Sequence, residues 1–128
     1  MTSISVDEVL QIHDLVIKTT GGLKGVKDHG RIESAVAGLV QNVFGIEIYP
    51  TVLHKAASLM RSLICDHPFA DGNKRTAMLC AITYLEINNV IFATEEHEIE
   101  DFAVKIATDK LSVEQIQEWL LDNSLAVI

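Results

Sequence analysis

The residues from His67 to Arg75 gather several chemically active side chains in one short stretch, His-Pro-Phe-Ala-Asp-Gly-Asn-Lys-Arg. His67 carries an imidazole, the side chain that most readily exchanges a proton near neutral pH. Asp71 offers a carboxylate to a hard cation such as Mg²⁺, which proteins usually hold through a few carboxylates and the substrate's own phosphates. Lys74 and Arg75 add cationic donors, and the guanidinium fork of Arg75 suits phosphate oxygens.

The backbone of this stretch is predicted to turn between two helices. Pro68 disfavours the helical conformation at His67, so the preceding helix should end near residue 65 or 66. Gly72 permits backbone conformations that other residues resist, and it lets a ligand approach the main chain. The next helix should begin near Asn73 and direct its free N–H groups at the loop, which favours phosphate binding. A base, a metal carboxylate and a phosphate cradle together predict transfer from a nucleotide to a hydroxyl.

This stretch resembles the signature of the Fic/Doc family. The resemblance extends to residues 21–26 (Gly-Gly-Leu-Lys-Gly-Val) and 30–35 (Gly-Arg-Ile-Glu-Ser-Ala). Together with the short length, these segments make the chain similar to the death-on-curing (Doc) toxin branch of the family. It implies a compact helical fold and Mg²⁺-dependent transfer from ATP to a protein hydroxyl. It also implies the roles of the motif residues: His67 as the base, Asp71 as the metal ligand, and Gly72, Asn73, Lys74 and Arg75 at the phosphates.

One departure from the family pattern concerns the group that is transferred. Many members that transfer AMP carry Gly where this chain has Lys74, and a second Arg where it has Met78. A Lys without the second Arg resembles the Doc branch, which is associated with phosphoryl transfer to a translation elongation factor. We therefore expect a kinase-type toxin that modifies a Ser or Thr hydroxyl, with elongation factor Tu as a candidate target. AMP transfer (AMPylation) and a non-catalytic nucleotide-binding module are the alternatives.

The resemblance also implies how the site is controlled. Family members that restrain themselves carry a (Ser/Thr)-x-x-x-Glu-(Gly/Asn) segment whose Glu reaches the motif Arg. The segments that follow Thr94, Ser112 and Ser124 do not fit this pattern. We therefore expect Arg75 to be free within this chain, and a small antitoxin protein to cover the site.

Length and composition predict one domain, residues 1–128, folded as a single compact all-α bundle of about six helices. Hydrophobic content of 48% and charged content of 22% are ordinary for a globular protein. The net charge of −8 argues against broad nucleic-acid binding, so we expect no direct nucleic-acid partner. The chain has no signal-peptide pattern and no run long enough to span a membrane, so we expect a cytoplasmic protein. Cys65 and Cys80 should then be reduced thiols.

Several further elements should position the motif. Ser5 and Glu8 predict a capping box that opens the first helix, which should stop at residues 19–22. A second helix is predicted over about residues 31–43, a third after Pro50, and a fourth to Ile87. His13, inside the first helix, is expected to be structural.

Later elements follow the same logic. Ser112 and Gln115 predict a second capping box. The acidic run over residues 95–101 should be the solvated start of another helix rather than a metal site.

Two segments are candidates for binding the protein target. The loop Gly21–Gly30, rich in glycine and carrying Lys24 and Lys27, is either a solvated connection or a substrate-binding loop. Residues 44–50 alternate apolar and polar side chains, which predicts an extended segment. The resemblance implies that this second segment is a flap that aligns the target's backbone by β-augmentation. Its expected contact residues are Ile46, Glu47 and Ile48.

Overall fold

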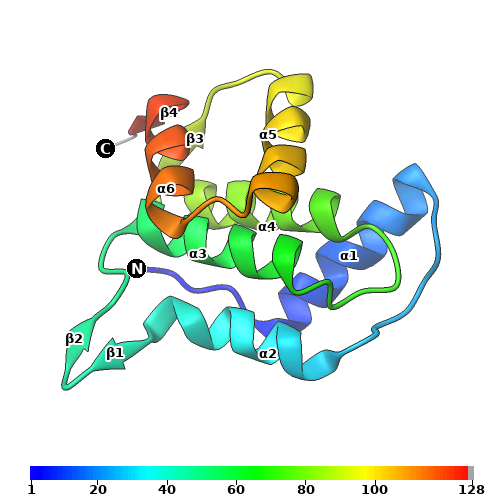
Figure 1. The fold of residues 1–128 in the computed structure, drawn as a ribbon, viewed down its shortest axis with the longest axis horizontal. Helices are drawn as coiled ribbons and strands as arrows, with labels where there is room; N and C mark the ends of the chain where they lie inside the picture. Colours follow the sequence, from blue (N-terminus) through cyan, green and yellow to red (C-terminus); the bar gives the residue numbers. More distant parts are fainter. Residues whose placement is uncertain (127–128) are drawn as a thin grey trace.

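Two central helices, α3 (Val52–Cys65) and α4 (Asn73–Ile87), carry the motif loop between them. Figure 1 shows them side by side, with α5 (Glu96–Asp109) and α6 (Val113–Asp122) above them, α2 (His29–Ala37) below, and α1 (Val6–Thr20) slanting past their right-hand end. The structure is a computed structural model that describes residues 1–126. The predicted all-α bundle of about six helices is confirmed.

The remaining elements are short. A 3-10 helix, η1 (Gly38–Val40), follows α2. β1 (Asn42–Val43) pairs antiparallel with β2 (Ile46–Glu47), and β3 (Val90–Phe92) pairs antiparallel with β4 (Ser124–Ala126). The second pair joins the end of α4 to the end of α6, so it closes the bundle on the side away from α1 (Figure 1).

The core lies where α3 and α4 meet the surrounding helices. Aliphatic side chains dominate it, which agrees with an aromatic content of 5%. α3 contributes buried residues on most of its surface, because α2, α4, α5 and α6 all contact it. Its largest fully buried side chains include Leu59, Met60, Leu63 and Ile64. A helix so enclosed is a rigid support for the loop that follows it.

Most helices begin at a side-chain cap, and two of these caps are predicted from the sequence. Ser5 with Glu8 and Ser112 with Gln115 form both expected capping boxes. Thr51 caps α3 through the N–H of His54. α4 differs, because it begins at Gly72, which has no side chain to cap the first turn.

α2 ends earlier than predicted, at Ala37 rather than near residue 43. Gly38, a weak helix former, follows at once, and the chain tightens into η1. Asn42 and Val43, predicted as helix, instead form strand β1. The difference arises because strand pairing with β2 and the tight turn satisfy this backbone better than another helical turn.

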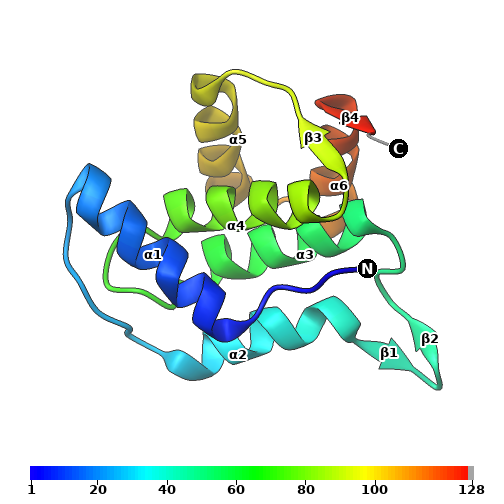
Figure 2. The ribbon, with the colours of Figure 1, turned by 180° about the vertical axis from the view of Figure 1, so that it is seen from behind.

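The predicted extended segment is part of a β-hairpin. Phe44 and Gly45 have φ values of 52° and 80°, the paired left-handed conformations of a two-residue hairpin turn. Figures 1 and 2 place this hairpin beside the first turn of α3, whereas the motif loop follows the last turn. With 14 residues, α3 is about 21 Å long. The extended conformation is thus confirmed at Ile46 and Glu47 but not at Phe44 and Gly45, which form the turn, and the hairpin does not lie over the motif loop.

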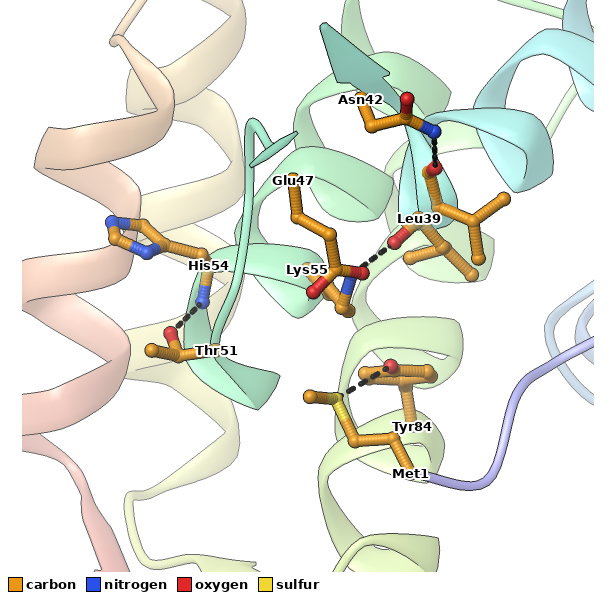
Figure 3. A network of polar contacts seen from close by, with 9 residues as sticks. Met1, Leu39, Asn42, Glu47, Thr51, His54, Lys55 and Tyr84 are labelled. Carbon is orange, nitrogen blue, oxygen red and sulfur yellow. Dashed lines mark hydrogen bonds and ion pairs between the residues drawn. The ribbon is translucent and has the colours of Figure 1, made fainter. Parts of the chain in front are cut away.

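A buried lysine ties the hairpin to α3 (Figure 3). Lys55 is 4% exposed, and its ammonium donates to the carbonyl of Leu39. The same ammonium pairs with the carboxylate of Glu47 at 2.9 Å. Burial, and secondarily the charge of Glu47, raise the pKa of Tyr84, whose ring lies nearby (Figure 3). One side chain therefore holds both η1 and β2.

Two simpler expectations can be checked against the structure. Cys65 and Cys80 are both free thiols, and burial raises the pKa of Cys80 to about 12. Within residues 1–126, no helix combines the length and the apolar character that crossing a membrane requires.

Lys55 should contribute to the stability of the fold. Lys55→Met keeps the length of the side chain but leaves the carbonyl of Leu39 without its donor, so the free energy of unfolding should fall by about 1–3 kcal/mol. Glu47→Gln should cost less, about 1 kcal/mol or under, because Glu47 is half-exposed and water replaces the lost contact. Urea denaturation measures both. A Lys55→Met protein as stable as wild type would contradict the anchoring role.

Candidate active site

The motif loop opens into a cavity of about 410 Å³ between the start of α4 and α5. The residues that line it include the exposed imidazole of His67 and the carboxylate of Asp71. α4 contributes Met78, and α5 contributes Glu100 and Val104. The structure thus brings together all six predicted motif residues: His67, Asp71, Gly72, Asn73, Lys74 and Arg75.

The start of α4 is arranged to receive an anion. Gly72 takes a left-handed conformation, φ 75° and ψ 18°, which glycine adopts without strain. A Cβ there would lie 3.2 Å from Cδ1 of Ile17 and 3.4 Å from Cγ1 of Val16, so α1 packs directly against this turn. No side chain of the described residues caps the helix, which leaves its first N–H groups and positive dipole end directed at the cavity.

The side chain of Asn73 does different work from that predicted. Its Oδ1 accepts the N–H of Phe69 at 3.0 Å, and its Nδ2 donates to the carbonyl of Phe69 at 3.0 Å. Both ends of the amide are therefore bound to the loop rather than directed at the cavity. The side chain of Asn73 thus closes the loop into a ring, while its backbone belongs to the start of α4 at the cavity.

Phe69 and His13 anchor this ring in the core. Phe69 is 1% exposed, and its ring stacks on the imidazole of His13 with centroids 3.7 Å apart. Nε2 of His13 lies 2.9 Å from the carbonyl oxygen of Asp71, within hydrogen-bonding distance. His13 is structural, as expected, and its contacts connect α1 to the motif loop.

The backbone at His67 is held from both sides. Its φ of 47° is left-handed, so Pro68 keeps it out of the right-handed helical region as predicted, although the conformation is not extended. Arg31 donates to the carbonyl of Asp66 at 2.6 Å. The carbonyl of Pro68 accepts the N–H groups of residues 27 and 28 at 2.8 and 3.0 Å. A non-glycine residue keeps such a conformation only when its surroundings impose it, which is common at functional sites.

The carboxylate of Asp71 is held by two backbone N–H groups. Oδ1 accepts from Gly72 at 2.9 Å, and Oδ2 accepts from Leu23 at 3.2 Å. No cluster of three or more His, Cys, Asp or Glu side chains suited to a metal occurs in the part of the chain that the structure describes. A single exposed carboxylate beside a phosphate cradle fits Mg²⁺, because this ion is usually completed by waters and substrate phosphates.

Arg75 is paired within the chain, which corrects the expectation that it is free. Nη2 of Arg75 lies 2.9 Å from the carboxylate of Glu100, and Nη1 lies 3.7 Å from that of Glu96. Glu96 and Glu100 are four residues apart in α5, so they share the face that passes the start of α4. Two carboxylates from the acidic run, predicted to be only solvated, therefore reach the guanidinium of Arg75.

The glycine-rich segment Gly21–Gly30 lies against the motif loop. Val26 forms a β-bridge with Phe69, and the carbonyl of Gly25 accepts the N–H of Ala70 at 3.1 Å. The segment therefore lies beside the site, whereas the predicted contact residues Ile46, Glu47 and Ile48 are not among the residues that line the cavity. The high glycine content of this segment is the feature of the sequence that indicates a position at the site.

The sequence matches a known protein family and known relatives. The model of the Fic/DOC family matches residues 3–85, which run from before α1 through the motif loop and most of α4. The chain is 39% identical over 98 residues to "Toxin Doc" of Mycolicibacterium smegmatis, an alignment that covers 75% of each chain. It is 35% identical over 121 residues to "Protein kinase doc" of Escherichia phage P1, with 94% of each chain covered.

The pairing of Arg75 predicts a competition between carboxylate and phosphate. Glu100→Gln should strengthen the binding of inorganic tripolyphosphate by up to about fivefold, because an ion pair this exposed is worth about 0.2–1 kcal/mol. Asp101→Asn removes the same charge from an exposed neighbouring position that does not line the cavity, so it should change the affinity less. Isothermal titration calorimetry measures both. Weaker binding by Glu100→Gln would mean that Glu100 supports Arg75 instead of competing for it.

Proposed function

The chain belongs to the Fic/DOC family, and we propose that it is the toxin of a toxin–antitoxin pair that phosphorylates a protein. The names of its relatives, a toxin and a protein kinase, support this proposal. The observation that carries it is that one cavity is lined by the imidazole of His67, the carboxylate of Asp71, the cations Lys74 and Arg75, and the uncapped start of α4. The reaction is transfer of the γ-phosphoryl group of ATP to a Ser or Thr hydroxyl.

Each motif group has a role in this reaction. His67 takes the proton of the target hydroxyl while the hydroxyl oxygen bonds to the γ-phosphorus. The bond between that phosphorus and the bridging oxygen breaks, and ADP leaves. The N–H groups at the start of α4, with Lys74 and Arg75, hold the phosphates. Asp71 would hold Mg²⁺, which would supply positive charge to the phosphate oxygens.

The choice of the γ-phosphoryl group rests on Lys74 and Met78, which both line the cavity. The transferred phosphorus must lie in line between the target hydroxyl and the leaving group. The ammonium of Lys74 fills space beside the helix start that a glycine would leave open, which disfavours a pose with the α-phosphorus at His67. Met78 lacks the guanidinium that would draw the distal phosphates deeper. Both features favour the γ-phosphorus beside His67.

The target is proposed to approach along the glycine-rich segment. Leu23 and Val26 are 69% and 43% exposed on the segment that crosses the motif loop. An extended target strand that contacts this segment would bring a hydroxyl toward His67, whereas one bound at the β1–β2 hairpin would lie the length of α3 away. Elongation factor Tu remains the proposed target on the family resemblance alone.

The antitoxin is proposed to occupy a second, more apolar cavity of about 450 Å³ between α1, α4 and α5. Its lining includes Val16, Leu79 and Ile82, and it shares Arg75 and Met78 with the first cavity. A segment that folds on binding here would reach Arg75 and obstruct the phosphates. Control by a partner is therefore compatible with the pairing of Arg75 inside the chain.

Labelled ATP tests the proposed function. Incubation of the chain and elongation factor Tu with ATP labelled at the γ-phosphorus should transfer label to protein, and α-labelled ATP should not. His67→Ala should lower the rate by about 10²–10⁴ because the base is lost. His97→Ala, an exposed histidine on α5 that does not line the cavity, is the control and should retain the wild-type rate. Transfer of the α label would indicate AMP transfer, and transfer of neither label would indicate a nucleotide-binding module.

A second prediction tests why the γ-phosphorus is chosen. Lys74→Gly should permit some AMP transfer because it opens the space beside the helix start, and adding Met78→Arg should increase it. Mass spectrometry of the modified target distinguishes a phosphoryl adduct from an adenylyl adduct. If neither variant formed any adenylyl adduct while remaining active as a kinase, Lys74 would contribute only positive charge.

A further inference from the structure

The carboxylate of Asp71 is fixed by a part of the chain far from the motif. Besides the N–H of Gly72, the N–H of Leu23 donates to Oδ2 at 3.2 Å, across 48 positions of sequence. These two donors engage one oxygen each, and Asp71 still lines the cavity. Each carboxylate oxygen can accept more than one contact, so the remaining lone pairs are available to a cation.

The residue before Leu23 leaves room for this arrangement. Gly22 has a φ of 115°, and a Cβ there would lie 2.7 Å from Oδ2 and 3.1 Å from Cγ of Asp71. Real Cβ atoms do not approach so closely, so any side chain at Gly22 would displace the carboxylate. Glycine is therefore required at position 22 for two reasons: the carboxylate of Asp71 leaves no room for a Cβ, and the positive φ disfavours other residues.

The segment that carries Leu23 is tied to the same loop further along. The carbonyl of Gly25 accepts the N–H of Ala70 at 3.1 Å, and the N–H groups of Lys27 and Asp28 donate to the carbonyl of Pro68 at 2.8 and 3.0 Å. Since these bonds flank the motif loop, the N–H of Leu23 is held in register with Asp71.

We propose that Gly22 and Leu23 are positioning residues for the metal carboxylate Asp71. The N–H of Leu23 orients Oδ2, and the missing side chain of Gly22 gives the carboxylate its place. This inference rests on the metal role proposed above for Asp71. It makes the glycine-rich segment part of the metal site as well as a candidate surface for the target, so that movement of the segment alters how Mg²⁺·ATP is held.

The test compares alanine substitutions at glycines of similar conformation. Gly22→Ala should weaken Mg²⁺-dependent binding of a non-hydrolysable ATP analogue on the order of 10-fold, as is typical when a group that orients a metal ligand is disturbed. Binding of the analogue in EDTA should stay at the wild-type value. Gly21→Ala, at a φ of 80°, is the control, because only atoms of its chain neighbours lie within 4 Å of the added Cβ. It should retain the wild-type Mg²⁺ dependence.

A second readout does not depend on the metal. In wild-type protein without Mg²⁺, the amide of Leu23 should exchange its hydrogen more slowly than in Asp71→Ala, as followed by NMR. Gly22→Ala should speed this exchange as well, whereas the amide of Lys27, bonded to Pro68, should be unchanged in both variants. Circular dichroism verifies that each variant is folded.

The outcomes separate the two claims. Equal loss of Mg²⁺ dependence in Gly22→Ala and Gly21→Ala would overturn the inference, because backbone strain alone would explain it. An exchange rate of the Leu23 amide that is the same in wild type and Asp71→Ala would also overturn the inference. If the nucleotide affinity of the wild-type protein were the same with and without Mg²⁺, the metal role in the proposed function would be refuted instead. Hydrogen exchange at the amide of Leu23 would still decide whether the segment positions Asp71.

Discussion

The burial of Phe69 is the interaction on which the site depends. A short polar loop does not by itself hold one conformation, because ordering each residue costs about 1–2 kcal/mol of backbone entropy. Here the ring of Phe69 lies in the core against His13, and the amide of Asn73 bonds both backbone groups of Phe69. The exposed groups on either side, His67 and Asp71, are thereby placed by a residue that has no chemical role of its own. The specificity of the site comes from packing as much as from polar contacts.

The sequence predicts the local parts of this arrangement and little of what joins them. Capping boxes at Ser5 and Ser112, the end of α3 and the start of α4 follow from residue types within a few positions of each other, so they were predicted. The motif residues around one cavity were predicted for the same reason. The β1–β2 hairpin was predicted as extended, but its distance from the motif depends on the direction in which α3 runs, which no local pattern encodes.

Two of the features that were missed join residues distant in sequence, and one is a local contact. Glu100 meets Arg75 because α5 crosses the start of α4, and nothing near either residue in the chain indicates that contact. The amide of Asn73 was expected at phosphate, but the nearby backbone of Phe69 satisfies it first. The bond from Leu23 to Asp71 spans two segments whose connection only the folded chain reveals. Tertiary contacts therefore set the electrostatics of the site, while local sequence sets its inventory of groups.

The β1–β2 hairpin offers a practical advantage because α3 separates it from the cavity. Its turn at Phe44 and Gly45 is at the surface, with Phe44 fully exposed, and Lys55 fixes the strands behind it. Exposed turns of this kind accept inserted sequence better than any helix of the bundle. A fluorescent label or an affinity tag placed there would be held by the folded domain without contacting the motif loop. The turn is therefore a suitable position for labelling the protein while it binds or reacts.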